Sequence, residues 1–365
     1  MRQHIKISIL VIIFISGLLI SCGGSSDKAP ASVASPPKTE APITLPTVVQ
    51  NHLPDELSPQ EAISQMAIGI NLGNTLDAPF EGDWAPKAQE FHIQAFKDAG
   101  FKHVRIPITW GNHISKTTPY EINEDFMLRV EQIVMWALDR DLIVIINAHH
   151  DDWIKSDFNN QQTRNRFDSI WLQVSERFKH HSAKLIFEIL NEPQDLSLTN
   201  TNTLNQRALK IIRNQTSNRL VIFAGTEWSN IEQLTLVDTP DPSDRFLTGN
   251  FHSYDPWSFA GQCLTSWGTD EDIENLENIY QRALDWSTEK DIPVMVNEFG
   301  VAKYDFTQPE NKCEQTEREA YIRAHVINAK KYGVAATFWD DAGSFSTYDR
   351  IENSWGPEKD ILVSQ

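Results

Sequence analysis

Residues 185–193 read LIFEILNEP, and residues 294–300 read VMVNEFG. Each stretch is a short apolar run that is followed or ended by a carboxylate, Glu192 in the first and Glu298 in the second. Apolar runs of this length, rich in Leu, Ile and Val, predict buried strands. A carboxylate at the end of a buried strand is costly unless it is hydrogen-bonded or used in chemistry. The two stretches therefore point to a fold and to a candidate site together.

Six further apolar runs accompany these two, and helical patterns lie between them. The predicted strands are Ala67–Gly73, His103–Ile108, Leu142–Ala148, Leu185–Leu190, Leu220–Gly225, Leu247–His252, Val294–Glu298 and Ala335–Trp339. The predicted helices are Ala85–Ala99, Glu124–Arg140, Arg164–Phe178, Thr201–Thr216, Asp270–Lys290 and Glu314–Tyr332. Alternation of this kind over about 300 residues predicts an α/β fold, a (β/α)8 TIM barrel with a single catalytic domain. An open doubly wound sheet is the alternative, but the sequence lacks the Gly-rich phosphate-binding turn that it would need.

The charge balance of the chain bears on its partners. The 365 residues carry 50 acidic and 32 basic side chains, a formal net charge of −18. Such a surface repels phosphate backbones and anionic lipids, so we expect no nucleic-acid partner. A neutral polysaccharide is permitted. We expect no cofactor and a monomer, although nothing in the sequence fixes the oligomeric state.

The N-terminal residues have the pattern of an export signal. An apolar run over Ile7–Ile20 follows a basic start and is short for a membrane-spanning helix, which predicts a signal peptide over residues 1–22. The residues around Cys22 resemble a bacterial lipobox, in which the Cys is lipidated; an ordinary signal peptide is the alternative. Residues 23–57 are rich in Pro and Ser and predict a flexible tether. We expect residues 58–365 to form the barrel of an exported protein, either lipid-anchored at the bacterial outer membrane or cell surface, or secreted.

In a barrel of this kind the C-terminal ends of the strands form the active site. Two Glu on the fourth and seventh strands would then face each other, as glycoside hydrolysis requires. Arg near a carboxylate keeps it ionised, and Trp stacks on sugar rings. Other polar and aromatic residues also fall at predicted strand ends: Arg105, His149, His150, His252, Tyr254, Trp257 and Trp339.

Seven stretches in this order resemble glycoside hydrolase family 5, whose members use catalytic Glu on strands 4 and 7. They are Gly69–Pro79, Val104–Pro107, Asn147–His150, Phe187–Pro193, His252–Tyr254, Asn297–Gly300 and Phe338–Trp339. The resemblance covers nearly the whole predicted barrel, and its first stretch is closest to the endoglucanases of that family.

The resemblance implies that Glu192 is the general acid/base and Glu298 the nucleophile. Arg105 and Tyr254 would support Glu298, and His252 would tune Glu192. The residues implied to bind sugar are Asn191 at the 2-hydroxyl, His149, His150 and Trp339 in the −1 subsite, and Asn71, Asp77 and Trp267 at distal sugars.

The implied activity is that of a retaining endo-β-1,4-glycanase, and an endo-β-1,4-glucanase acting on cellulose or mixed-linkage glucan fits best. A β-mannanase or xyloglucanase of the same family is the alternative. The sequence departs from the family at Asp340 and Asp341, where many relatives carry Glu or an amide, and in the polar loop Asp157–Thr163. These departures leave the preferred glycan open.

Two readings of other classes compete with the glycosidase. A metal hydrolase could use His149 and His150, but neighbouring residues on a strand point to opposite faces, so we expect no metal. A non-catalytic, surface glycan-binding lipoprotein would need aromatic and amide side chains but no carboxylate pair. Cys263 and Cys313 would lie on neighbouring loops after export, either as a disulfide or as two thiols.

Overall fold

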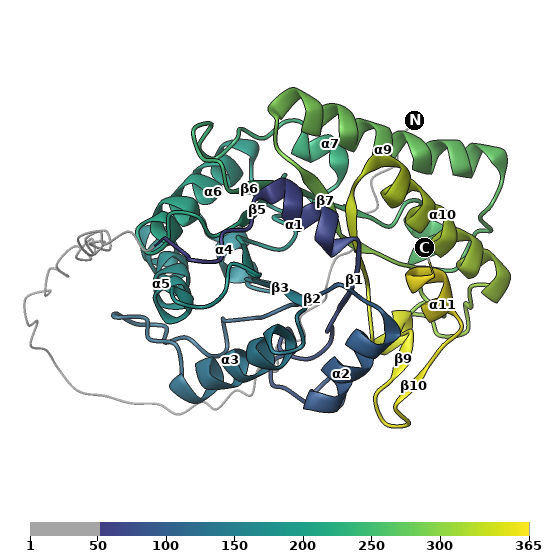
Figure 1. The fold of residues 1–365 in the computed structure, drawn as a ribbon, viewed down its shortest axis with the longest axis horizontal. Coiled ribbons are helices and arrows are strands. Elements are labelled where there is room, and N and C mark those ends of the chain that lie inside the picture. Colours follow the sequence, from purple (N-terminus) through teal and green to yellow (C-terminus); the bar gives the residue numbers. More distant parts are fainter. Residues whose placement is uncertain (1–51, 365) are drawn as a thin grey trace, which may run out of the picture. The chain divides into compact units, whose positions relative to one another are not determined.

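The computed structural model describes residues 52–364, which all belong to one compact unit. Eight parallel strands pair in chain order and close into a barrel, as Figure 1 shows. The predicted (β/α)8 barrel is therefore confirmed, and the open-sheet alternative is wrong. The barrel strands are β1 Ile68–Asn71, β2 His103–Ile106, β3 Ile143–Asn147, β4 Leu185–Glu188, β5 Val221–Ala224, β6 Leu247–Ser253, β7 Val294–Phe299 and β8 Ala335–Phe338.

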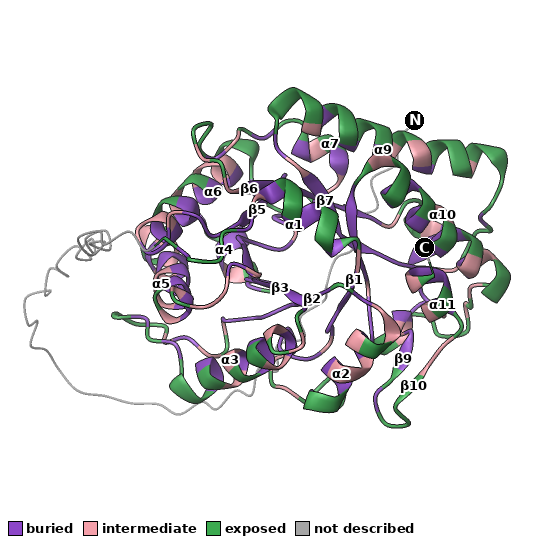
Figure 2. Cartoon of the chain, viewed as in Figure 1, coloured by how far each residue is buried: buried purple, intermediate pink, exposed green. Residues whose placement is uncertain are grey.

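Helices surround the barrel and bury their inner faces against it (Figures 1 and 2). The longer ones are α2 Glu90–Ala99, α3 Glu124–Leu138, α5 Gln161–Phe178, α6 Leu198–Arg213, α9 Asp270–Lys290 and α10 Gln315–Tyr332. The shorter elements are α1 Pro59–Met66, α4 Asp152–Ser156, α7 Ile231–Leu234, α8 Trp257–Ala260, η1 Gly343–Phe345, β9 Tyr348–Asp349, β10 Ser354–Trp355 and α11 Glu358–Val363. Among the helices of residues 52–364, none has the length and apolar character needed to span a membrane.

Alternate residues of several strands, β3 among them, pack into different cores. Val144 and Ile146 of β3 belong to the large core between strands and helices. Ile143 and Ile145 belong to a second core, together with Ile186 of β4. This follows from the two-residue period of a strand, because one set faces outward to the helices and the other faces into the barrel. Parallel strands buried on both faces explain the continuous apolar runs of the sequence.

The N-terminal end of the barrel is closed by residues that were expected to be tether. Leu53 and Leu57 are buried in the inner core beside α1. The backbone of Leu53 also donates to the Asn218 side chain at 2.7 Å and accepts from it at 3.1 Å. The predicted boundary at residue 58 is therefore too late, and the packed domain includes residues 52–57. The earlier part of the predicted tether, the signal peptide and Cys22 lie outside the described residues.

Shortening the chain to Ser58 is expected to destabilise the barrel. Deleting Leu53 and Leu57 exposes the inner core, and each lost Leu side chain costs about 2–5 kcal/mol of unfolding free energy. Urea unfolding of chains that begin at residue 40 and at residue 58 measures the difference, and Leu53→Ala in the longer chain is the matched control. Identical unfolding midpoints would contradict the packing of this segment.

Candidate active site

The two candidate carboxylates meet at the C-terminal end of the barrel. Glu298 lies within β7 and is 5% exposed, whereas Glu192 follows β4 and remains partly exposed. A carboxylate oxygen of each, together with a ring nitrogen of His252, lies within 4.8 Å of the others. The backbone of Glu192 has a left-handed φ of 38°, a conformation that non-glycine residues rarely adopt outside functional sites and turns. Two carboxylates this close can act on a single bond between them.

Arg105 on β2 is fully buried beneath these groups. Its Nη1 donates to Glu298 Oε1 at 2.6 Å, and its Nε and Nη2 donate to the two oxygens of Glu188 at 2.6 and 2.8 Å. The remaining hydrogen bonds reach Asn71 Oδ1 at 2.9 Å and Asn191 Oδ1 at 2.8 Å. Burial works against its charge, but the charges of Glu188 and Glu298 outweigh burial and raise the pKa of the guanidinium. Arg105 therefore stays cationic and holds Glu298 through a charged hydrogen bond.

The second oxygen of Glu298 is held by Tyr254. The Tyr254 hydroxyl donates to Glu298 Oε2 at 2.9 Å. Burial, followed by the charges of Glu298 and Glu192, raises the pKa of Tyr254 well above its usual value, so the hydroxyl keeps its proton and remains a donor. With Arg105 on one oxygen and Tyr254 on the other, Glu298 is fixed in orientation as a nucleophile requires.

His252 of β6 connects the two carboxylates. Its Nδ1 lies 3.0 Å from Glu192 Oε1 and 3.7 Å from Glu298 Oε2. Burial opposes protonation of the imidazole, but the charge of Glu298 and the hydrogen bond with Glu192 outweigh burial and raise the pKa of His252. A protonated His252 would stabilise negative charge on both carboxylates.

The raised pKa of His252 predicts a pH-dependent contribution to stability. The protonated ring contributes stability that is fully present below the unfolded-state pKa, about 6.5, and is lost as pH rises through the higher folded-state value. The melting temperature of the native chain should therefore exceed that of His252→Gln most at about pH 6 and least at about pH 9. A difference that grows with pH would show that the ring is held neutral. Tyr254→Phe, which leaves His252 in place, is the control.

Aromatic and imidazole rings line the barrel mouth beside the carboxylates. His149 and the partly exposed Trp339 lie parallel, with an interplanar angle of 4° and centroids 5.7 Å apart. His150 is exposed, and Trp84 from the loop after β1 approaches it at 5.7 Å. Burial and the neighbouring His150 lower the pKa of His149 well below its usual value, so its ring is neutral. Rings beside a carboxylate pair suit a sugar that has one apolar face.

The distal-sugar residues implied by the resemblance lie deeper than expected. Asn71 is fully buried, donates to the carbonyls of Asn297 and Phe338, and accepts from Arg105. All its hydrogen-bonding groups are occupied by the protein, so the expectation that it contacts sugar is corrected: it positions Arg105.

Asp77 and Trp267 are buried as well. The oxygens of Asp77 accept the backbone amides of Asn74 and Thr75, and burial raises its pKa to about 6. An oxygen of Asp77 also lies within 4.8 Å of ring nitrogens of His149 and His150, a spacing that could hold a metal ion. Trp267 packs on Phe259 and is 5% exposed. Contact of Asp77 or Trp267 with sugar therefore stays a prediction.

Glu188 is the site residue that the sequence reading missed. It is fully buried and binds Arg105 through both oxygens. Residues 185–188, LIFE, carry the signal for this role, because a carboxylate inside a buried strand requires a cationic or hydrogen-bonding partner. Arg105, in the stretch Val104–Pro107, is a cation that could pair with Glu188. The sequence does not show that this one Arg binds both Glu188 and Glu298.

The sequence profile of the family described as Cellulase (glycosyl hydrolase family 5) matches residues 68–343, which contain both Glu192 and Glu298. The chain belongs to glycosyl hydrolase family 5. This match extends from β1 to the loop after β8 and therefore covers the whole barrel.

Among family 5 relatives, endoglucanase H of Acetivibrio thermocellus is 41% identical over 81% of this chain, which spans only 32% of that longer protein. Endoglucanase B of Ruminococcus albus is 30% identical, with 93% of this chain and 90% of that protein covered. The crystal structure of endoglucanase Cel5A from Thermotoga maritima is 30% identical with a TM-score of 0.79, covering 84% of this chain and all of that one.

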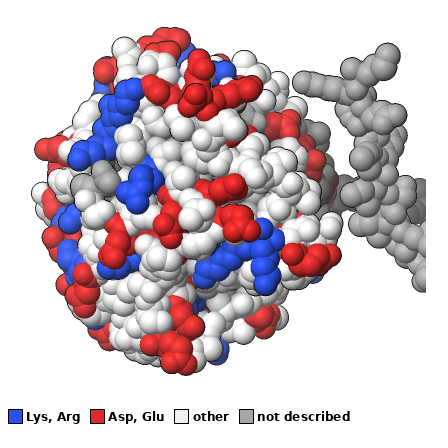
Figure 3. Space-filling view, turned by 90° about the vertical axis from the view of Figure 1, so that its right-hand side faces the viewer, with Lys and Arg blue, Asp and Glu red and all other residues white. Residues whose placement is uncertain are grey.

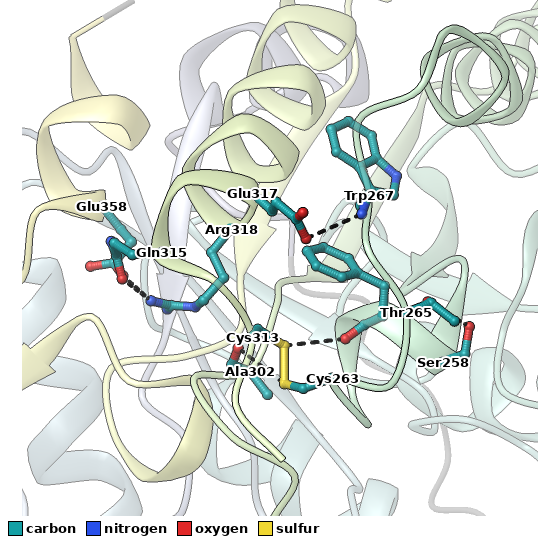
Figure 4. Close-up of a disulfide and its surroundings, with 11 residues drawn as sticks. Ser258, Cys263, Thr265, Trp267, Ala302, Cys313, Gln315, Glu317, Arg318 and Glu358 are labelled. Atoms are coloured by element: carbon teal, nitrogen blue, oxygen red, sulfur yellow. Dashed lines mark hydrogen bonds and ion pairs between the residues drawn. A yellow bond between two sulfur atoms is a disulfide. The ribbon is translucent and has the colours of Figure 1, made fainter.

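A disulfide joins two loops at the active-site end of this family 5 barrel. Cys263 lies between α8 and α9, Cys313 directly precedes α10, and their Cα atoms are 4.6 Å apart (Figure 4). The two cysteines therefore form a disulfide, which is one of the two alternatives that the sequence left open. This cross-link restricts the loop that follows Tyr254. A disulfide that closes a loop of 50 residues typically stabilises a fold by about 4 kcal/mol.

The departure at Asp340 and Asp341 is a buried acidic pair beneath Trp339. Asp341 binds Arg350 through both oxygens, at 2.6 and 2.7 Å. Asp340 accepts from Asn74 at 2.6 Å, and burial together with Asp341 raises its pKa well above the usual range. The acidic pair therefore fixes the loop after β8 through Arg350 and Asn74.

Proposed function

We propose that this chain is a retaining endo-β-1,4-glucanase in which Glu298 is the nucleophile and Glu192 the general acid/base. The observation that carries the proposal is the pair of carboxylate oxygens within 4.8 Å on β7 and after β4. Retaining enzymes hold their carboxyl groups about 5–5.5 Å apart, whereas inverting enzymes need room for a water molecule between carboxylate and sugar.

The chemistry follows from the environments of the two groups. Glu298, held by Arg105 and Tyr254, attacks the anomeric carbon as Glu192 gives its proton to the leaving oxygen. The glycosidic C–O bond breaks and an ester to Glu298 forms. Glu192, now ionised, removes a proton from water, which attacks the same carbon and releases the sugar from Glu298 with net retention.

Several neighbours have roles in substrate binding under this proposal. The Asn191 oxygen is fixed by Arg105, which leaves its amide group to donate to the 2-hydroxyl of the sugar in the −1 subsite. His149, His150 and Trp339 form the walls and platform of that subsite. The His252 ring, 3.0 Å from Glu192, holds this carboxyl group in place as it alternates between acid and base.

The proposal also names the polysaccharide that the enzyme hydrolyses. The named relatives are endoglucanases, which supports β-1,4-glucan. The Thermotoga maritima enzyme has also been crystallised with mannotriose, which keeps mannan as the alternative substrate. We further propose export with lipidation at Cys22, which rests on the sequence pattern alone; labelling of the full chain and of Cys22→Ala with a fatty-acid probe in a bacterial host tests it.

The test of function is hydrolysis of a polymer panel by residues 40–365. Reducing-sugar release and viscosity are followed on hydroxyethyl cellulose, barley glucan, xyloglucan and mannan, in the presence of a chelator. A rapid fall in viscosity on the glucans, with the β-anomer as first product by NMR, is the expected result. Fastest hydrolysis of mannan would change the substrate, and an initial α-anomer would exclude retention. Binding without hydrolysis of any polymer or aryl β-glycoside would favour the glycan-binding alternative, and inhibition by the chelator would favour the metal hydrolase.

A further inference from the structure

A second cavity opens beside the active site, between the loops that follow β1, β7 and β8. It has a volume of about 370 Å³, and its lining includes Trp84, Lys303, Ser346 and Trp355. Trp84 is 48% exposed and lies against His150, the exposed imidazole at the barrel mouth. The cavity therefore continues the candidate sugar-binding surface past His150.

Arg350 also lines this cavity but is bound by Asp341, so Lys303 is its available cation. Lys303 follows β7 by a few residues and is half-buried, and its Nζ donates to Ser346 Oγ at 3.0 Å. Its backbone is fixed from both sides, because its amide donates to the Ser344 carbonyl and its carbonyl accepts from Cys313, the disulfide residue. Within residues 52–364 no carboxylate forms an ion pair with its ammonium group.

The acidic side chains around Lys303, including Asp349 in the cavity lining, are bound to other groups. Glu358 pairs with Arg318 at 2.7 Å, and Asp349 accepts the backbone amides of Ile351 and Glu352. Asp340 is buried and accepts the Asn74 side-chain amide at 2.6 Å. Burial lowers the pKa of Lys303, and Glu358 only partly offsets this effect.

This cation stands out in a chain with a net charge of −18. Figure 3 shows acidic side chains spread over one face of the molecule, with separate groups of basic ones between them. A half-buried ammonium with free donors is a ready partner for an anion, and an indole beside it offers a surface for a sugar ring.

We propose that this cavity is an accessory subsite for a carboxylate-bearing group on a β-glucan chain, with Lys303 as the anion contact and Trp84 as the stacking surface. The inference rests on the proposed function, because it places the main glucan chain across Glu192 and Glu298. A uronosyl or carboxymethyl substituent has the required chemistry, and hydroxyl-only substituents do not. The enzyme would then prefer acidic over neutral glucans despite its own negative charge.

The experiment compares carboxymethyl cellulose with hydroxyethyl cellulose, matched in length and substitution. Lys303→Met should lower kcat/KM on the carboxymethyl polymer by roughly five-fold through KM, with little change on the neutral one. Lys303→Arg should restore most of the preference, and the effect should shrink as salt is raised. Lys290→Met is the matched control, because Lys290 is exposed near the N-terminal end of β7.

An equal loss of kcat/KM on both polymers would overturn the inference and assign Lys303 a structural role. No loss of kcat/KM on either polymer would show that Lys303 does not contact the substrate. Affinity electrophoresis in gels that contain each polymer repeats the comparison without requiring turnover. If the native chain hydrolyses no polymer, the proposed function is contradicted and the accessory subsite is not. If both polymers slow the migration of the protein equally with and without Lys303→Met, the accessory subsite is contradicted and the proposed function is not.

Discussion

Replacing Glu298 by Gln is expected to lower kcat/KM on a soluble β-glucan by about 10⁴-fold or more, because the amide cannot form the covalent intermediate. Glu298 accepts hydrogen bonds from Arg105 and Tyr254, and the Gln side chain has nearly the same shape, so the fold should persist. The measurement is steady-state kinetics on barley glucan, with circular dichroism as the check on folding.

Glu192→Gln is the matched variant for this test. It removes the acid but not the nucleophile, so activity should recover on aryl β-cellobiosides whose leaving groups need no proton. A 2-fluoro glycoside should label Glu298 in the native chain and be located there by mass spectrometry. Recovery in Glu298→Gln but not in Glu192→Gln would reverse the assigned roles.

Replacing Arg105 by Met is expected to reduce both stability and activity. The change leaves Glu188 and Glu298 buried without their cation, and breaking such a pair costs about 3–5 kcal/mol of unfolding free energy. Because Glu298 also loses a charged hydrogen bond, we expect kcat/KM to fall by about 100-fold or more. Urea unfolding and kinetics on the same samples measure the two effects.

A second substitution separates these effects. Adding Glu188→Gln to Arg105→Met removes one uncompensated carboxylate and should recover part of the unfolding free energy. Activity should stay low, because Glu298 still lacks its partner. Full recovery of activity in the double variant would mean that Arg105 acts only through folding.

The sequence predicted most of the barrel and the residues around the carboxylates. The run at β3 is apolar up to Asn147, and β7 begins with three apolar residues, so both strands are predicted to within one or two residues. The helix expected from Ala85 begins instead at Glu90, because the preceding residues are held by other contacts, including the Ala88 amide on Glu81. The apolar periodicity of the helix does not reveal a side-chain contact of this kind with the preceding loop.

The errors in the site have a similar cause. Asn71 lies in a motif typical of substrate-binding residues, but its burial depends on β7 and β8, which are distant in the chain. The 52–57 segment has no periodicity, and only its packing beneath the barrel makes Leu53 part of the core. Proximity of Cys263 and Cys313 was predictable from the barrel topology, whereas their bond was not.

The position of Leu53 also fixes how the barrel can be attached to anything else. The chain enters the fold beneath the inner core, at the end of the barrel opposite to Glu192 and Glu298. A fusion partner, resin or surface joined upstream of His52 would therefore face the closed end, and the open mouth would point away from the support. Immobilisation through the N-terminal side should leave even insoluble fibres accessible to the enzyme.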